Sequence, residues 1–598
     1  MAHFYLQYHS AFDGAQQLLA NLVADEARLD KPRSSPRVIA NRLQTIVKDA
    51  MPILVENGWN KAPVLGDATI RGDTQSLTVI CIDEATDLFS PDDRDESSGR
   101  YRPSISFRAF RSALRSFSQN KVGTMPVLGL LLDTSSHITD FAPPASTDAS
   151  QKYPTFHKLL RPIYYLETWD VFASDPPSQG KKPSWLEIAC QRNDGNDDSN
   201  FLAHGPDGSI DHQVFMARFG RPLWASVVTT ATDMATDAKM GDEKDRIFQR
   251  ALDHIRSLAY DKLTGTTPDN SIALLLYRLQ FHVQDHRLAE NLVARWMHYF
   301  SYVAMDRTWV CTCQPSEPVL ALAAAQKLLD HKTRCRAFRD FVQMHLHGVL
   351  HAGDCGEVVA SLLLIFAADA HLDPGHPKTV SLSAFLTTLL GDINNGDDSE
   401  WADGEILLTH FNRLRLRGNQ SLTAKHLISA FVLGQGFILP QGMAGADLLV
   451  PVWLRAEQRM GALLVQVKNR ANGTLTKTMC AHARGSMEMA EHALPFLKTT
   501  KVFGMYISLR GKPGKDGSPH EWLPSRSGRL PIVVTAGFAL SVFPVLKGPK
   551  PGGFAASANV EDDIEQILRQ LLNNVGQVVL PDDRIEGVDS ILYTREPL

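Results

Sequence analysis

The stretch that most constrains the fold of this chain runs from residue 445 to residue 470 and reads GADLLVPVWLRAEQRMGALLVQVKNR. Two apolar runs flank a polar turn, which predicts two strands joined as a hairpin. Because strand side chains alternate, we expect Gln466 and Lys468 on one face and their apolar neighbours on the other. With Asp447 at the start of the first strand, a carboxylate, an amide and an ammonium converge at one edge of a sheet. Such a group could hold a divalent cation and steady a phosphate.

Composition and charge limit the class of protein. A chain of 598 residues with 44% hydrophobic and 21% charged residues has room for about three or four folded domains. Its formal net charge of -5 gives no overall basic surface, so any nucleic-acid site has to be local. The start of the chain shows no charged segment followed by an apolar run, and no stretch reaches about 18 uninterrupted apolar residues. We therefore expect an intracellular protein with no membrane partner.

Two apolar runs in the N-terminal part predict neighbouring strands of a parallel sheet. The first, LTVICI, is followed by Asp83 and Glu84, and the second, MPVLGLLL, is followed closely by Thr134. Short runs that are apolar on both faces suit central strands of an α/β domain. A strand followed by Asp-Glu is the Walker B pattern of P-loop NTPases, in which the Asp holds the magnesium shell and the Glu orients the attacking water. Thr134 would then act as a sensor residue beside it.

The other parts of a nucleotide site are incomplete. Arg218 and Arg221, in the segment FMARFGRPLW, could reach a phosphate. The string G-x-x-x-x-G-K-[ST], whose backbone amides and lysine hold the phosphates, does not occur in the chain. Either the domain has lost nucleotide hydrolysis, or the chain begins downstream of its P-loop. We do not expect ATP as a cofactor of the chain as it stands.

Shifts in composition divide the chain into three parts and a linker. Residues 1–235 read as an NTPase-like domain without Walker A, and residues 240–390 read as a helical domain of the lid or winged-helix kind. The acidic, turn-rich segment 391–405 reads as a linker. Residues 406–598 contain a helix, the hairpin described above, a second helix, two more strands and a closing helix. The expected fold class is multidomain α/β.

The order helix, two strands, helix, strand resembles the PD-(D/E)xK restriction-endonuclease-like superfamily, with Asp447 before one strand and Gln466-x-Lys468 in the next. In that superfamily two acidic residues bind the catalytic metal, and the lysine positions or activates the attacking water. The resemblance implies that Asp447 is the metal carboxylate, Gln466 stands at the second acidic position and Lys468 is the catalytic lysine. Magnesium is the implied cofactor. Glutamine at an acidic position removes one negative charge, which should weaken metal binding.

Most of the chain, from about residue 77 to about residue 540, resembles fungal Crinkler-type proteins. In those proteins a P-loop NTPase module precedes such a nuclease-like domain. Besides the features above, the segments FGRPLW, PSEPVL and GDCGEVVASLLL carry this resemblance. It implies an effector-like or conflict-related role.

Two functions fit these patterns. In the first, the protein is a metal-dependent nuclease, and Arg470, Lys477 and Arg484 neutralise phosphates beside the catalytic residues. In the second, the protein keeps both folds without either chemistry and acts as a nucleic-acid-binding or regulatory protein. The missing phosphate loop and Gln466 favour the second function. The type of nucleic acid stays open at this point.

Overall fold

A computed structural model describes the strands Thr78–Ile82 and Val127–Leu131 and, with gaps, residues 210–573. The gaps are residues 237–240, 281–282, 284–285, 304–309, 315, 347–351, 373–376, 392–402, 415–421, 441–442, 458, 470–472, 496, 498–500, 526–529 and 548–563. The chain divides into two compact units. One comprises Met1–Pro162 with Met305–Thr308, and the other comprises Ile163–Ala304 with Trp309–Leu598.

The first unit contains a parallel pair of strands. Strand β1, Thr78–Ile82, pairs with strand β2, Val127–Leu131, in continuous register. These strands are the two apolar runs of the N-terminal part, so the prediction of neighbouring parallel strands is confirmed for this pair. Asp83, Glu84 and Thr134 lie outside the described residues.

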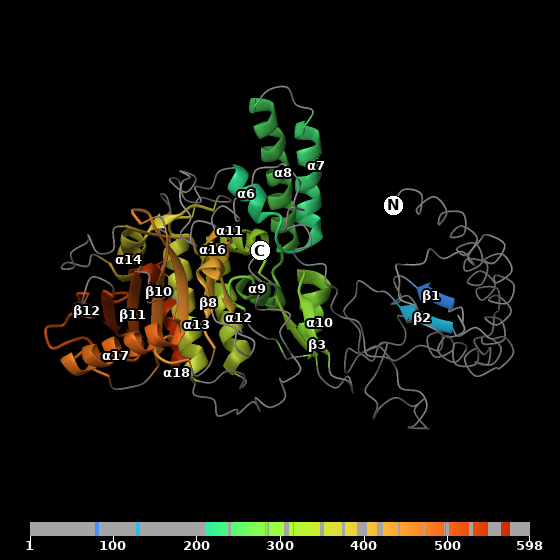
Figure 1. Cartoon of the computed structure of the whole chain (residues 1–598). Helices are drawn as coiled ribbons and strands as arrows, with labels where there is room; N and C mark the ends of the chain where they lie inside the picture. The colour runs from blue at the N-terminus through green and yellow to red at the C-terminus, as the bar shows by residue number, and fades with distance from the viewer. Residues whose placement is uncertain are drawn as a thin grey trace, which may run out of the picture. The chain divides into compact units, whose positions relative to one another are not determined.

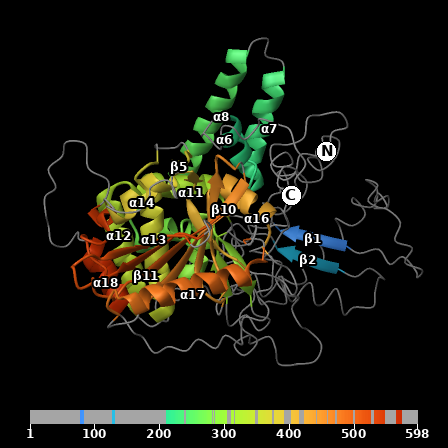
Figure 2. The same cartoon turned by 60° about the vertical axis from the view of Figure 1, so that its left-hand side comes forward.

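The described part of the second unit begins with three helices, α6 (Ile210–Met216), α7 (Pro222–Thr236) and α8 (Gly241–Lys262). Helices α7 and α8 lie side by side and project from the rest of this unit (Figure 1, Figure 2). Their shared core is small and is built on Ala231, Ala235 and Phe248.

A strand hairpin interrupts the expected helical domain. Helix α9 spans Pro268–Leu276 and helix α10 spans His286–Trp296. The next segment, expected to be helical, forms strand β3, Tyr299–Val303, which pairs antiparallel with β4, Val310–Cys313. The helical prediction was wrong here because YFSYV is rich in aromatic and β-branched residues, which pack well across paired strands.

Four further helices complete this region. Helix α11 begins at Pro318, and proline is well tolerated in the first turn of a helix. The four helices are α11 (Pro318–Leu328), α12 (His331–Leu346), α13 (Ala352–Asp369) and α14 (Leu382–Leu390).

A nine-stranded mixed sheet organises the second unit. Its main path is β12-β13-β11-β10-β9-β6-β5, and β8 joins it by pairing with β9 while β7 pairs with β8. The segment expected to be a linker ends inside this sheet, because β6 begins at Gly404. The strands are β5 (Val380–Ser381), β6 (Gly404–Ile406), β7 (His410–Arg413), β8 (Gln435–Ile438), β9 (Leu448–Leu454), β10 (Arg459–Lys468), β11 (Val502–Ser508), β12 (His520–Leu523) and β13 (Ile532–Ala536).

The predicted hairpin is β9 and β10, which pair antiparallel from Leu454↔Arg459 to Leu448↔Val465. On its other edge β10 runs parallel to β11. A helix precedes the hairpin and another follows it, as expected: α16 (Ala424–Val432) and α17 (Lys477–Ala493).

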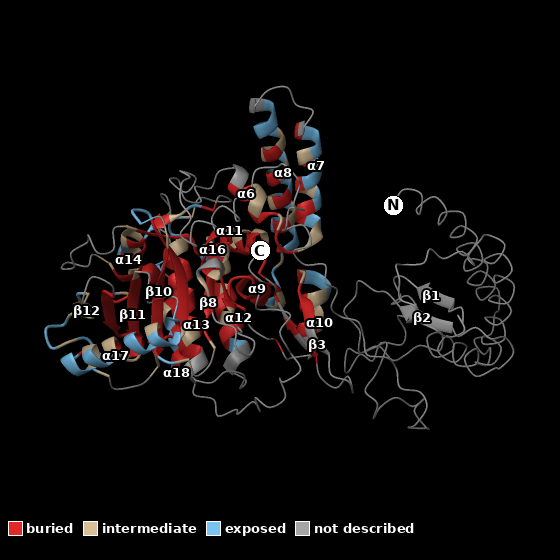
Figure 3. Cartoon of the chain, in the orientation of Figure 1, coloured by how far each residue is buried: buried red, intermediate tan, exposed pale blue. Residues whose placement is uncertain are grey.

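Helices cover both faces of the sheet. Met460, Ala462 and Leu464 of β10 share a core with residues of α16 and α17. On the other face, a Cβ atom built on Gly356 of α13 would lie 3.4 Å from Val467 Cγ1, and α13 also packs against α18 (Ile564–Asn573). Figure 3 shows β10 and β11 buried and the outer side of α17 exposed. The polar residues of β10 lie toward its two ends, with Arg459 at its start and Gln466 and Lys468 near its finish.

Among the described helices, none combines the length and the apolar character that crossing a membrane requires.

Candidate functional site

Asp447 sits at the point where the chain enters β9. Its backbone N–H donates to the carbonyl of Val465 at 2.8 Å, and its carbonyl accepts from the N–H of Leu439 at 2.8 Å. Both hydrogen bonds extend the sheet by one residue beyond the end of the strand. The backbone of Asp447 is thus held between β8 and β10, and the position of its carboxylate follows from strand pairing.

Gly445 fixes the approach of the chain to Asp447. Its φ angle is +84°, and a Cβ atom at this position would lie 1.8 Å from the carbonyl oxygen of Ser486 and 2.7 Å from the backbone nitrogen of Ala490. Only glycine combines this backbone conformation with so close an approach. The segment before Asp447 therefore packs directly on the backbone of α17.

The Asp447 carboxylate accepts hydrogen bonds from neutral donors. Its Oδ2 atom accepts from Nε2 of Gln466 at 2.6 Å and from the backbone N–H of Val467 at 2.6 Å. Burial raises the pKa of Asp447 above its ordinary value, although the Val467 N–H, the Lys468 charge and the Gln466 amide each act in the opposite direction. The hydrogen bonds thus compensate only in part for the loss of water around this carboxylate.

Lys468 ends β10 on the same face as Gln466. Its register partner on β11 is Ser508, and its side chain is half-buried. Its charge is close enough to lower the pKa of Asp447. In the described part of the chain, however, it forms no ion pair within 4 Å. The structure therefore brings Asp447, Gln466 and Lys468 to one edge of the sheet, and their catalytic roles stay predictions.

The other residues expected to contact nucleic acid lie on or near α17. Lys477 is the first residue of α17 and is exposed. Arg484 is half-buried and donates to the carbonyl of Pro524 at 3.0 Å. Arg470 lies outside the described residues.

Arg221, expected to reach a nucleotide phosphate, is held by an acidic residue. Its Nε donates to Oε2 of Glu317 at 2.9 Å, and its Nη2 donates to Oε1 of Glu317 at 2.8 Å and to the carbonyl of Met297 at 2.7 Å. Glu317 also accepts from the indole N–H of Trp224 at 3.1 Å. Burial by itself would lower the pKa of Arg221, but Glu317 raises it above its ordinary value.

The contact between Arg221 and Glu317 joins two of the segments that carry the resemblance, FGRPLW and PSEPVL. It gives this arginine a structural role. Arg218 is half-buried on the same segment, and a role in nucleotide binding stays a prediction for both arginines.

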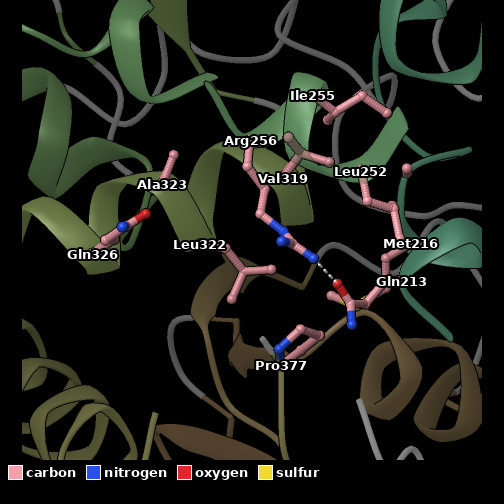
Figure 4. Close-up of a pocket in the computed structure, with 11 residues that line it drawn as sticks. Gln213, Met216, Leu252, Ile255, Arg256, Val319, Leu322, Ala323, Gln326 and Pro377 are labelled. Atoms are coloured by element: carbon pink, nitrogen blue, oxygen red, sulfur yellow. Dashed lines mark hydrogen bonds between the residues drawn. The ribbon is translucent and has the colours of Figure 1, made fainter. Parts of the chain in front are cut away.

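A small cavity lies between α6, α8 and α11, away from the sheet edge (Figure 4). Gln213 and Arg256 point toward one another across it and are hydrogen-bonded. Val319, Leu322 and Pro377 contribute apolar lining. With a volume of about 40 Å³, the cavity has room for two or three water molecules rather than for a nucleotide.

A metal ion at the candidate site would depend on few ligands. No cluster of three or more His, Cys, Asp and Glu side chains suited to a metal occurs among the described residues. The oxygens at the site are those of Asp447 and the amide oxygen of Gln466. This donor set fits Mg²⁺, which prefers oxygen, keeps several of its waters and often takes only one or two carboxylates from a protein. The incompletely compensated carboxylate of Asp447 also favours a nearby cation.

Several residues that shape the site were not predicted from the sequence. Gly445 is one of them. A set of cations on the loop after β11, namely Arg510, Lys512 and Lys515, is another. The signal for this loop was present in SLRGKPGKDGS, where basic residues alternate with glycines directly after a buried strand.

Comparison with known proteins gives two family matches. A model described as a domain of unknown function (DUF8736) matches residues 269–491, and a model described as a domain of unknown function (DUF8735) matches residues 38–165. The first match contains Asp447, Gln466 and Lys468, and the second contains β1 and β2. No curated protein and no solved structure matches the chain. The chain is thus similar to two families of unknown function, and most of each match falls in a different compact unit.

Proposed function

We propose that the segment from α16 to β11 is a nuclease core of the PD-(D/E)xK kind and that it hydrolyses phosphodiester bonds in nucleic acid with a divalent cation. The order α16, β8, β9, β10, α17, β11 supports this proposal. So do the strand directions, with β9 antiparallel and β11 parallel to β10. The fungal Crinkler-type architecture described above is part of the same proposal.

The observation that carries the proposal is the meeting of Asp447, Gln466 and Lys468. The Asp447 carboxylate lies 2.6 Å from the Gln466 amide nitrogen, and Lys468 follows two residues later on the same face. In the folded chain a carboxylate and a lysine are thus neighbours at a sheet edge, and the burial that raises the pKa of Asp447 also strengthens its interaction with a cation.

Each side chain has a distinct role in this proposal. Asp447 and the amide oxygen of Gln466 would hold Mg²⁺, which neutralises charge on the scissile phosphate. Val467 N–H and the Gln466 amide keep the carboxylate of Asp447 in place through its Oδ2 atom. Lys468 orients the attacking water and stabilises the negative charge that develops on the phosphate oxygens.

A cleavage assay with matched variants tests this function. Plasmid and linear DNA, and RNA, are incubated with the purified full-length chain and with Mg²⁺ or Mn²⁺. We expect cleavage by the natural chain and a loss of at least about 100-fold in Asp447→Asn and in Lys468→Ala, since each removes a group that acts on the transition state. Lys262→Ala, which removes an exposed lysine from α8, is the control and should cleave normally.

The assay also separates the nuclease from the second function, a protein that binds nucleic acid without cutting it. That alternative has support in Gln466, because its amide replaces the second acid and donates to Asp447. Cleavage that persists undiminished in both site variants, or no cleavage by any form of the chain, would contradict the nuclease proposal.

For the first unit we propose an NTPase-like sheet that binds no nucleotide in this chain. The parallel pairing of β1 and β2 supports the sheet, and the absence of a Walker A string argues against nucleotide hydrolysis. Saturating ATP with Mg²⁺ should leave the melting temperature unchanged, because only a ligand bound to the folded state stabilises it. A clear rise would contradict the proposal.

A further inference from the structure

Two segments that together carry four basic residues meet just beyond the ends of β10 and β11. Residues 473–477 lead into α17, and residues 509–515 follow β11. We call these two segments the basic ledge. The N–H of Leu475 donates to the carbonyl of Lys512 at 3.0 Å, and the N–H of Lys512 donates to the carbonyl of Gly473 at 2.7 Å. The N–H of Leu509 donates to the carbonyl of Lys468 at 3.0 Å, which joins the ledge directly to the candidate site.

Close packing holds the ledge in one shape. A Cβ atom on Gly511 would lie 2.7 Å from Oγ of Ser508 and 2.9 Å from the carbonyl oxygen of Gly473. A Cβ atom on Gly473 would lie 2.9 Å from Cε of Met479. Glycine at position 511 allows the two segments to approach this closely, because its Cβ position faces the Gly473 carbonyl oxygen. The cations that they carry are therefore displayed on a fixed backbone, which lowers the entropy cost of binding.

The ledge concentrates positive charge. Lys477, Lys512 and Lys515 are exposed, and Arg510 is partly exposed. None of these four side chains is engaged in an ion pair with another described residue. The nearest acid in the sequence, Asp516, accepts a hydrogen bond from the N–H of Ser518 at 3.1 Å. A chain with a net charge of -5 thus carries a local cluster of cations beside Lys468.

The composition of the ledge indicates what it binds. Residues 468–477 and 507–519 contain no Phe, Tyr or Trp. Platforms for single strands stack bases on aromatic side chains, so this surface lacks the usual means of binding unpaired bases. Lysines and an arginine on a rigid backbone instead suit the closely spaced phosphates of a duplex.

We infer that the basic ledge binds the sugar-phosphate backbone of a nucleic-acid duplex next to the candidate site, without reading its bases. This inference rests on the proposed nuclease function for its choice of partner. It assigns Arg510, Lys512 and Lys515 to substrate binding and makes the substrate double-stranded.

Binding is measured with the full-length chain carrying Asp447→Asn, so that no cleavage occurs. Fluorescence anisotropy follows a short labelled DNA duplex over a range of salt concentrations. In the double variant Lys512→Gln/Lys515→Gln the affinity should fall roughly 10- to 60-fold at about 0.1 M salt, and the slope of log K against log salt should fall by about 1.8. The double variant Lys262→Gln/Lys332→Gln removes the same charge from exposed positions in α8 and α12 and should change neither quantity.

The outcomes separate this inference from the proposed function. A ledge variant that binds the duplex with unchanged affinity and salt slope would overturn the inference, even if the natural chain cleaves DNA. Tighter binding of the corresponding single strand, unaffected by the ledge variant, would overturn it as well. Ledge-dependent duplex binding by a chain that never cleaves would support the inference and contradict the nuclease.

Discussion

Two carboxylates of the second unit differ in their burial and in the groups that compensate for their charge. Glu317, whose side chain is 0% exposed, accepts from both the guanidinium of Arg221 and the indole of Trp224. Asp447 at the sheet edge is less buried, and among the described residues it accepts from the Gln466 amide and the Val467 N–H and forms no ion pair with Lys468 within 4 Å. Glu317 is therefore paired with a cation, whereas Asp447 has no ion-pair partner within 4 Å in the part of the chain that the structure describes.

The difference between Glu317 and Asp447 indicates which of the two carboxylates stabilises the fold. A second buried pair follows the first pattern, since Arg278 and Asp369 are 1% and 3% exposed and form two hydrogen bonds at 3.0 and 2.6 Å. Buried charges are tolerated only when a partner compensates for their lost hydration. Asp447 has neutral donors and, among the described residues, no ion-pair partner, so in the proposed nuclease an external cation would compensate for its charge.

The largest expected effect comes from breaking a scaffold pair. In Glu317→Gln the Arg221 guanidinium stays buried without its counter-charge, so we expect the free energy of unfolding to fall by about 3–5 kcal/mol. Urea denaturation followed by circular dichroism measures this change. The control Asp253→Asn breaks the exposed pair of Asp253 with Arg256 and should cost less than about 1 kcal/mol. Equal effects in both variants would show that the buried pair of Glu317 with Arg221 contributes no more to stability than an exposed pair.

The next largest effect is expected at Gly445, where the segment before Asp447 packs on α17. Gly445→Ala adds a methyl group where a Cβ would lie 1.8 Å from a backbone oxygen, at a φ angle of +84°. We expect a loss of about 2–4 kcal/mol in the free energy of unfolding, together with a displaced Asp447. Gly485 lies on the same helix that Gly445 contacts, and its Cβ position is open. Gly485→Ala should therefore stabilise the chain by about 0.5–1 kcal/mol. If Gly445→Ala behaves like Gly485→Ala, Gly445 does not pack on the backbone of α17.

Glu317 and Gly445 show which parts of the fold and of the candidate site could be predicted from the sequence and which could not. Alternation within β9 and β10 was enough to predict the hairpin and to place Gln466 and Lys468 on one face. The pairing of Arg221 with Glu317 joins residues 96 positions apart, and the contact of Gly445 with α17 depends on how a helix crosses the sheet. Neither is encoded in a local pattern. Residues 299–303 were predicted as helix because their apolar character was read without regard to their strand propensity.

A smaller effect is expected from adding the charge that the site lacks. In Gln466→Glu a second carboxylate lies beside Asp447, so without metal the two like charges should reduce the free energy of unfolding by about 1–2 kcal/mol. With Mg²⁺ or Mn²⁺ the same charge should tighten binding at least about tenfold. Isothermal titration calorimetry and the metal-dependent rise in melting temperature measure this gain. Adding Asp447→Asn to the Gln466→Glu chain is the control and should abolish most of the gain. Metal affinity unchanged by Gln466→Glu would mean that no cation binds between these two positions.

The smallest effect is a difference in pH dependence. Burial raises the pKa of Asp447 in the folded chain above its ordinary value of 3.8. A raised carboxyl pKa contributes stability below the unfolded pKa and loses it as pH rises through the folded pKa. The stability of the natural chain relative to Asp447→Asn should therefore decrease as pH rises from about 3.8 through that value.

Asp330 provides a control of opposite sign. Burial raises the pKa of its carboxyl, but the hydrogen bond from the N–H of Thr333 and the charge of Lys332 leave it below 3.8. Its contribution to stability is present above the unfolded pKa and is lost as pH falls, so the stability of the natural chain relative to Asp330→Asn should increase with pH. Urea denaturation at a series of pH values measures both differences. Two curves of the same sign would show that the Asp447 carboxylate is as well compensated as an ordinary helix cap, and the site would then lose the property that distinguishes it from the scaffold.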